Sequence, residues 1–478
     1  MTQTTETVLQ REDDAVDYTT HPEKMLLLSR AELLAMDPAE VERIQIEAIR
    51  GRLAELRGKI AVLGRLADEQ GIDDVTSINE AAPLLFKHSI YKSYPVSLIE
   101  RNRFDRLTTW LQGLTTIDLS GLDTEGIDSI DGWLDALLAQ ADLRIIHSTG
   151  TSGKLSFVPR GAFERANQIR TSSLAYDSGE DGAGADDLRG KPMVIMGHRV
   201  MFNGYGASLD ALVHHLYDGD ESMLYTLNPG RMSADLLSLA GRLAAADAKG
   251  DLGREQIPAA ILARRDQFVA EQKEAPARRR AFFRKVVTEL KGRPILMTGN
   301  WLMYHELMTA AREEGTADGV FHKDSRFVSA GGTKGRVFPD GYQDDIKRFL
   351  GVEKVGVGYG MSEITTLMMM CPEGKYHALP TIVCFVLDPE TGEPAPREGT
   401  HTGRFGCIDL AIKSHWGGIL SGDEVTITYG KCACGHDGPF IEDTVRRYSE
   451  KEGGDDKIVC AGAPEAHDNA LDFLAELD

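Results

Sequence analysis

The sequence predicts an α/β fold in which helices cover a largely parallel sheet. Residues 192–196 and 294–297 are short apolar runs that stop at glycine or polar turns, as buried parallel strands do. Residues 231–246 and 278–290 are long helical stretches that separate such runs. Strands that alternate with helices are typical of a parallel sheet whose faces the helices cover.

The regions on either side of this predicted sheet differ from it. From Val41, apolar residues recur at steps of three and four, which predicts a helix with one apolar stripe. The stripe consists of Ile46, Ile49, Leu53, Leu56, Ile60 and Leu63. Residues 381–387 and 406–410 look like strands, and residues 388–392 look like a tight turn. We therefore expect a helical N-terminal region and a β-rich subdomain from about residue 375.

Size and charge exclude several classes of protein. A chain of 478 residues with 42% hydrophobic and 27% charged residues forms one large packed domain with a smaller appendage, or two domains. Its net charge of -21 repels a nucleic-acid backbone. No apolar run approaches the length of a membrane-spanning helix. We expect neither nucleic acid nor a membrane as a partner.

The cysteines and the polar segments indicate a location and two exposed regions. All six cysteines lie in the last quarter of the chain, whereas a disulfide framework would be spread along it. This clustering indicates a local site in a reducing compartment, and no signal-peptide core is recognisable, so we expect a cytoplasmic protein. Residues 1–20 are polar and acidic and predict a disordered tail. Residues 177–187 predict an exposed loop.

The first segment that could carry chemistry follows the apolar pair Ile145 and Ile146. It consists of Ser148, Thr149, Gly150, Thr151, Ser152, Gly153 and Lys154. Glycines let backbone N–H groups approach a phosphate, hydroxyls donate to its oxygens, and Lys154 can neutralise charge as pyrophosphate leaves. A Ser/Thr/Gly-rich surface turn is the alternative interpretation.

Two later segments add groups that suit a nucleotide. Residues 355–363 read as a strand that runs into a glycine turn, in which Tyr359 could stack on adenine and Glu363 could hold Mg²⁺. Residues 420–423 read as a second glycine turn, in which Asp423 could accept hydrogen bonds from both ribose hydroxyls. Taken alone, the first of these segments is most often a strand terminator, and the second is weak.

In this order the three segments resemble the superfamily of adenylate-forming enzymes, which contains acyl-CoA synthetases, luciferases and peptide-synthetase adenylation domains. That family has a Ser/Thr-Ser/Thr-Gly-Thr-Ser/Thr-Gly loop, a Tyr-Gly-x-Ser/Thr-Glu motif, matched here by Tyr359, Gly360, Ser362 and Glu363, and a Thr-Gly-Asp motif. The closer likeness, from about residue 86 to 462, is to phenylacetate-CoA ligases and acyl-protein synthetases. Lys154 directly after the loop glycine, residues 92–95 and residues 388–394 support it.

The resemblance implies further residues of an ATP site. Gly331, Gly332 and Thr333 would form the loop that lies against the adenine and the acyl group, although a plain strand-to-helix turn explains them as well. The arginine that follows the ribose motif in the family would be Arg446 or Arg447, and we favour Arg447. Lys154, Ser362 and Glu363 would be the catalytic residues, with Glu363 as the magnesium ligand.

Four residues in the last quarter predict a metal site. Cys371 and His377 form a C-x5-H arrangement, and Cys432 and Cys434 form a C-x-C arrangement about sixty residues later. Three thiolates and one imidazole suit structural Zn²⁺. Some phenylacetate-CoA ligase-like proteins carry a similar arrangement. The alternative is a set of free, partly buried cysteines.

The resemblance also implies a division of the chain. Residues 21–420 would be the large N-terminal domain of the adenylate-forming fold, residues 421–462 the ribose motif, zinc knuckle and hinge, and residues 463–478 a short remnant. The family's mobile C-terminal domain, which brings a second lysine to the phosphates, would be missing or vestigial. A partner protein could supply that function.

The expected activity is the activation of a carboxylic acid by ATP and Mg²⁺ to acyl-AMP, with release of pyrophosphate. Transfer of the acyl group to the thiol of CoA or of a carrier protein would follow. Two alternatives stay open at this stage. One is a relative that transfers acyl groups without adenylating them, and the other is a scaffold subunit of an acyl-activating complex.

Overall fold

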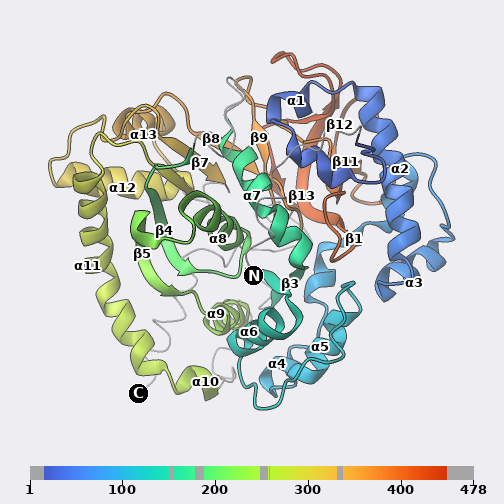
Figure 1. The fold of residues 1–478 in the computed structure, drawn as a ribbon, viewed down its shortest axis with the longest axis horizontal. Helices are drawn as coiled ribbons and strands as arrows, with labels where there is room; N and C mark the ends of the chain where they lie inside the picture. Colours follow the sequence, from blue (N-terminus) through green and yellow to red (C-terminus); the bar gives the residue numbers. More distant parts are fainter. Residues whose placement is uncertain are drawn as a thin grey trace.

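The computed structural model describes residues 16–149, 154–177, 188–247, 257, 259–330 and 337–448. Within that part of the chain, one 13-stranded sheet runs through the molecule, and a separate two-stranded sheet lies beside it (Figure 1). No helix of the described residues is long and apolar enough to cross a membrane. Of the predicted tail, residues 16–20 are described and include a turn in which the Thr19 amide donates to the Asp17 carboxylate.

The parallel half of the large sheet has the strand order β5-β4-β6-β7-β8. Its strands are β4 (Met193–Val200), β5 (Leu224–Arg231), β6 (Leu296–Gly299), β7 (Arg326–Ala330) and β8 (Gly356–Tyr359). The apolar runs at residues 192–196 and 294–297 thus become β4 and β6, which are adjacent and parallel. The predicted α/β fold is confirmed.

Helices cover both faces of this parallel half because alternate side chains of a strand point to opposite faces. Val194 of β4 belongs to a buried cluster with α11, α12 and α13, whereas Ile195 belongs to a different cluster with α7 and α8. Figure 1 shows α7 and α8 in front of the strands and α11 to α13 along the left side. These helices are α7 (Ala162–Tyr176), α8 (Gly204–Tyr217), α11 (Arg265–Glu289), α12 (Trp301–Glu313) and α13 (Tyr342–Leu350).

The predicted long helices are present with different bounds. The stretch at residues 231–246 becomes α9 (Ala234–Asp247), because Arg231 still belongs to β5. The stretch at residues 278–290 is the second half of α11, which begins at Arg265 and contains Pro276. A short α10 (Ala259–Leu262) precedes it.

The β-rich region continues the same sheet. Strand β9 pairs with β8 in antiparallel fashion, and the order β9-β10-β14-β13-β12-β11 follows without a break. These strands are β9 (Met368–Met370), β10 (Tyr376–His377), β11 (Ile382–Leu387), β12 (Gly399–Asp409), β13 (Gly418–Tyr429) and β14 (Phe440–Ile441). Two short strands, β1 (Phe86–Lys87) and β15 (Arg446–Arg447), also pair with β13. The β-rich texture after residue 375 is confirmed.

The N-terminal helices pack beside these antiparallel strands (Figure 1). The stripe from Ile46 to Leu63 lies on two helices, not one: α2 (Pro38–Leu56) and α3 (Ala61–Gln70). Ile60 has extended backbone angles between them, and its side chain is fully buried. The other helices of this half are α1 (Arg30–Leu34), α4 (Ser97–Glu100), α5 (Phe104–Gln112) and α6 (Ile130–Ala141).

The second sheet is an antiparallel hairpin of β2 (Arg144–Thr149) and β3 (Leu155–Arg160). Every residue of β3 is buried. The hairpin carries the predicted phosphate loop at its tip, between Thr149 and Lys154.

Candidate active site

The described residues at the tip of the β2–β3 hairpin are held by polar contacts. The hydroxyl oxygens of Ser148 and Ser156 lie 2.5 Å apart. Lys154 donates from Nζ to the Tyr94 carbonyl oxygen at 2.8 Å and lies 5.7 Å from the centre of the Tyr94 ring. The predicted loop residues Gly150, Thr151, Ser152 and Gly153 lie outside the described residues, as does the side chain of Thr149.

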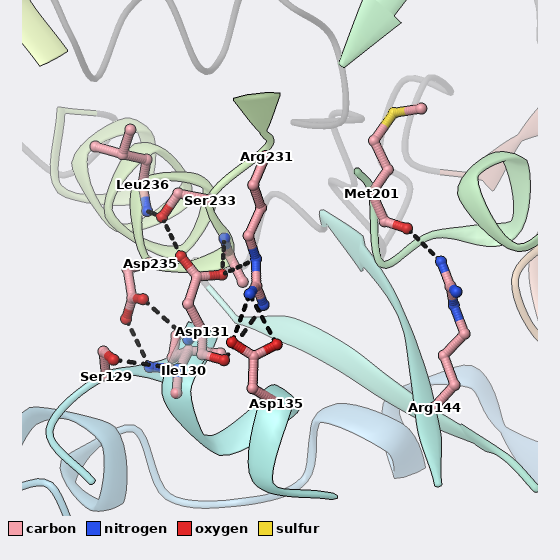
Figure 2. A network of polar contacts seen from close by, with 12 residues as sticks. Ser129, Ile130, Asp131, Asp135, Arg144, Met201, Arg231, Ser233, Asp235 and Leu236 are labelled. Atoms are coloured by element: carbon pink, nitrogen blue, oxygen red, sulfur yellow. Dashed lines mark hydrogen bonds and ion pairs between the residues drawn. The ribbon is translucent and has the colours of Figure 1, made fainter. Parts of the chain in front are cut away.

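The hairpin is bound to the loop that follows β4. The His147 amide donates to the Phe202 carbonyl at 2.7 Å. The Arg144 guanidinium donates to the Met201 carbonyl at 2.6 Å (Figure 2). The guanidinium carbons of Arg144 and Arg231 lie 5.2 and 4.6 Å from the centre of the Phe202 ring. Because the loop lies at the carboxyl end of β4, these contacts place the hairpin at the edge of the sheet where ligands of α/β proteins collect.

Two helices beside the hairpin cap each other. Asp235 of α9 accepts hydrogen bonds from the backbone amides of Ile130 and Asp131, at the start of α6. Asp131 in turn accepts from Ser233 and from the Ala234 amide, at the start of α9 (Figure 2). Burial and the neighbouring Asp131 carboxylate raise the pKa of Asp235 to about 6. Exchanged N-caps of this kind fix the relative position of the two helices.

The second predicted segment follows β8. Tyr359, the last residue of β8, donates from its hydroxyl to the Asp423 carboxylate at 2.8 Å. Its ring centre lies 5.6 Å from that of Phe405 and 6.0 Å from that of Tyr376. The structure therefore brings the second and third predicted segments into contact, and it pairs the Tyr359 hydroxyl with Asp423.

The third predicted segment is not a glycine turn, so that interpretation is wrong. Residues 420–423 lie within β13, at a point where the pairing register with β12 shifts between Arg404 and Gly406. A β-bulge of this kind re-aims a side chain, and bulges are over-represented next to functional sites. Arg447 of β15 pairs with Asp423, and its Nε lies 3.7 Å from the carboxylate. Arg447 is thus the arginine that lies beside the predicted ribose ligand.

The turn that carries Ser362 and Glu363 is held at its backbone. Asp409 is fully buried and accepts hydrogen bonds from the amide and the hydroxyl of Thr365, both at 2.7 Å. Arg160, the last residue of β3, donates to the Ser362 carbonyl at 2.9 Å. The Glu363 side chain is half-buried, and burial raises the pKa of its carboxyl.

The sequence alone did not point to Asp409 and Arg160. They lie far from Glu363 in the sequence, and no motif contains them. The sequence feature that could have found them is a charged residue at the end of an apolar strand. Residues 155–159 precede Arg160, residues 405–408 precede Asp409, and both runs are largely buried. The predicted loop residues Gly331, Gly332 and Thr333 lie outside the described residues.

The four predicted metal ligands lie together. One ligand atom from each of Cys371, His377, Cys432 and Cys434 lies within 4.8 Å of the others. The Cys371 amide is hydrogen-bonded to the Lys375 carbonyl and the Cys432 amide to the His436 carbonyl, so Cys371 and Cys432 each start a tight turn. All four are brought together by the pairing of β10 with both β9 and β14.

The surroundings of this cluster fit a metal. His377 is fully buried, and its Nε2 lies 3.3 Å from the Cys434 sulfur, as expected of an imidazole and a thiol that can share one metal ion. Burial lowers the pKa of Arg30, and negative charge on Asp177, Cys371 and Cys434 opposes this shift. A buried cation beside a three-thiolate, one-histidine set offsets the net negative charge that such a set has with Zn²⁺.

Comparison with known proteins found no matching family model and no matching curated protein. Among solved structures, the chain is similar to 2-hydroxyisobutyryl-CoA ligase in complex with 2-HIB-AMP and CoA, at 14% identity, over 87% of this chain and 76% of that one, with a TM-score of 0.45. ATP-bound MatB from Rhodopseudomonas palustris is similar at 14% identity, over 81% and 72% of the two chains, with a TM-score of 0.34.

A long-chain-fatty-acid-CoA ligase from Archaeoglobus fulgidus is similar at 12% identity, over 63% of this chain and 50% of that one, with a TM-score of 0.34. These similarities concern the fold. They do not tell which acid or which acyl acceptor this chain uses.

Proposed function

We propose that this chain activates a carboxylic acid with Mg-ATP, forming acyl-AMP and pyrophosphate, and then transfers the acyl group to the thiol of CoA or of a carrier protein. The observation that carries the proposal is the meeting of three distant segments. The hairpin with Lys154 contacts the turn with Glu363 through Arg160, and the strand before that turn contacts Asp423 through Tyr359.

The residues divide the work by their chemistry. Ser148 and Lys154 bind the phosphates, and the Lys154 amine must leave the Tyr94 carbonyl to reach them. Asp423, steadied by Tyr359 and Arg447, accepts the ribose hydroxyls. Glu363 suits Mg²⁺, because its carboxylate makes no hydrogen bond to another side chain in the described part of the chain, and Mg²⁺ takes oxygen ligands. The ion supplies charge stabilisation as pyrophosphate leaves.

We further propose that Cys371, His377, Cys432 and Cys434 hold one structural Zn²⁺. Four protein ligands leave no open position for a substrate, so the role of the metal is to join the β9–β10 hairpin, which follows the Glu363 turn, to the segment between β13 and β14. Among the described residues the cysteines form no disulfide, which is typical of a reducing compartment and supports a location in the cytoplasm.

The activity is tested by the exchange of labelled pyrophosphate into ATP, which reports the reversible adenylation step. The purified chain is incubated with Mg-ATP and, one at a time, acids from a panel of aliphatic, aromatic and hydroxylated carboxylates. Exchange that depends on one class of acid supports the proposal. If the chain binds Mg-ATP and no acid of the panel promotes exchange, the proposed adenylation is wrong.

A further inference from the structure

A buried arginine joins the hairpin of the proposed phosphate site to the turn of the proposed magnesium ligand. Arg160 is 4% exposed, and it is the last residue of β3. One of its terminal nitrogens donates to the Ser362 carbonyl at 2.9 Å, and the other lies 2.7 Å from Nε2 of His415. The guanidinium thus touches the residue directly before Glu363.

The second contact of Arg160 is firm because His415 is itself fixed. His415 is fully buried, and its Nδ1 lies 2.9 Å from the Tyr91 hydroxyl. Burial, together with the charges of Arg160 and Arg52, lowers the pKa of His415 well below its usual range. The Gly417 amide donates to the same Nδ1 at 3.1 Å, which also fixes the ring.

Around Arg160, carboxylates other than Glu363 are occupied by backbone amides. Glu164 accepts from the amides of Lys413 and Ser414, the latter at 2.9 Å, and Asp409 accepts from the amides of Thr365 and Ala411. Burial lowers the pKa of Arg160, and the carboxylates of Glu164, Asp409 and, least of the three, Glu363 oppose this shift. A buried cation is costly unless its charge and donors are used. Here the guanidinium donates to the backbone of the Glu363 turn, and its charge is balanced mainly by Glu164 and Asp409.

We propose that Arg160 is a positioning residue that fixes the Ser362–Glu363 turn relative to the β2–β3 hairpin, so that the metal-binding and phosphate-binding groups keep a constant separation. This inference rests on the proposed function, because it assigns Mg²⁺ to Glu363. It predicts that loss of the guanidinium weakens metal-dependent nucleotide binding and leaves metal-free nucleotide binding nearly unchanged.

The test compares R160M and R160K with wild type and with R144M as the matched control. Arg144 faces Arg160 in the register of the same hairpin and is also buried, but it donates to the Met201 carbonyl and not to the Ser362 turn. The readout is calorimetric binding of ATP with Mn²⁺ and of ATP in the presence of EDTA. Outer contacts of metal ligands typically change metal affinity by about 10- to 100-fold when they are removed.

We expect R160M to bind Mn-ATP about 10-fold more weakly than wild type. We expect R160K to recover part of this loss because its amine can still donate to the Ser362 carbonyl, and R144M to show no metal-specific change. If R160M does not fold, R160K decides alone, because lysine keeps the charge but replaces the planar two-pronged guanidinium with a single amine.

The outcomes separate this inference from the proposed function. If wild type binds Mn-ATP tightly and the folded Arg160 variants bind it equally well, the positioning role is wrong and the proposed function stands. A loss in the variants that is as large with EDTA as with Mn²⁺ overturns the positioning role in the same way. If wild type binds ATP with no dependence on the metal, both the magnesium role of Glu363 and this inference are wrong.

Discussion

At the scale of single residues, Lys154 is the cation of the hairpin tip, and its amine is held by one backbone carbonyl, that of Tyr94. Replacing it with alanine removes that bond and the charge that, in the proposed function, faces the departing pyrophosphate. Loss of one preorganised group of this kind lowers a rate by about 10²- to 10³-fold. We therefore expect K154A to lower the acid-dependent pyrophosphate exchange by about that factor.

The control for this prediction is K87A, which removes an exposed lysine on β1. We expect K87A to exchange at the wild-type rate. Equal rates for K154A and wild type, with both proteins folded, would exclude a role for Lys154 at the phosphates.

A second prediction at this scale concerns the Tyr359 hydroxyl. Its hydrogen bond to Asp423 fixes the carboxylate that we assign to the ribose. A hydrogen bond to a charged group contributes about 1.5–3 kcal/mol, so Y359F should raise the KM for ATP at least about 10-fold and leave the KM for the acid unchanged. Steady-state kinetics with each substrate varied in turn measure both. The control is Y376F, which removes a hydroxyl from a ring whose centre lies 6.0 Å from that of Tyr359 and should change neither KM. An unchanged KM for ATP in Y359F argues against the assignment of Asp423 to the ribose.

The sequence points to those residues of the proposed site that belong to local motifs, and it misses those that act across the fold. Ser148, Tyr359 and Asp423 are recognisable because each follows or interrupts an apolar run beside glycine. Arg160 and Asp409 are recognisable only once tertiary packing shows that their charges are buried and turned toward one loop. Arg447 is an intermediate case: it was predicted, but only from the family likeness. Its pairing with Asp423 through β15 is a long-range contact that no local pattern shows.

At the scale of elements, the large sheet shows why strand type is easier to predict than sheet connectivity. Residues 381–387 and 406–410 are short, mostly apolar runs with a tight turn after the first, as β-strands are, so the β-rich texture was predictable. These strands join the parallel strands in one sheet through the pairing of β8 with β9. That pairing depends on which edge of the parallel sheet is free, and no local sequence pattern gives this information. Likewise the stripe from Ile46 to Leu63 keeps its spacing across Ile60, where the backbone becomes extended and one helix becomes two.

The Cys/His cluster carries a prediction about two elements, the β9–β10 hairpin and the segment after β13. We expect the purified chain to contain about one zinc ion per chain, and C434S to lose it together with part of the thermal stability. Metal analysis and thermal unfolding with and without a chelator measure both quantities. C384A removes a buried cysteine outside the cluster and should retain the metal. A wild-type chain free of zinc after purification without chelators, and indifferent to added zinc, contradicts the assignment.

The exchanged caps of α6 and α9 carry a prediction about pH. The pKa of Asp235 is about 6 in the folded chain and 3.8 ordinarily, so the folded state keeps a proton that the unfolded state has lost between these values. The free energy of unfolding therefore contains a contribution that is present below about pH 4 and is lost as the pH rises through about 6. In D235N this contribution is absent, so its stability should fall less than that of wild type over this range.

Denaturant unfolding at several pH values tests this prediction. S129A is the matched control, because Ser129 caps the same end of α6 without a titratable group. We expect S129A to lose about 1 kcal/mol at every pH. Parallel stability curves for wild type and D235N would contradict the role of the Asp131–Asp235 pair.

At the scale of the whole molecule, the parallel strands, the hairpin and the antiparallel strands each contribute one part of the proposed site. The hairpin brings Lys154, the carboxyl end of β8 leads to Glu363, and the bulge of β13 brings Asp423. These parts are joined by side chains that span the elements, namely Arg160 and Tyr359. In the proposed function, the molecule is therefore a scaffold that holds phosphate, metal and ribose ligands at fixed separations.

The most direct test of the proposed adenylation is a search for the acyl-adenylate itself. The chain is mixed with Mg-ATP and a pool of carboxylic acids, passed through a desalting column, denatured, and analysed by mass spectrometry, with K154A treated in parallel. We expect the wild-type chain to carry acyl-AMP of one acid class and K154A to carry little or none. Bound ATP without any acyl-AMP, from a wild-type chain that has met every acid of the pool, would contradict the proposed adenylation.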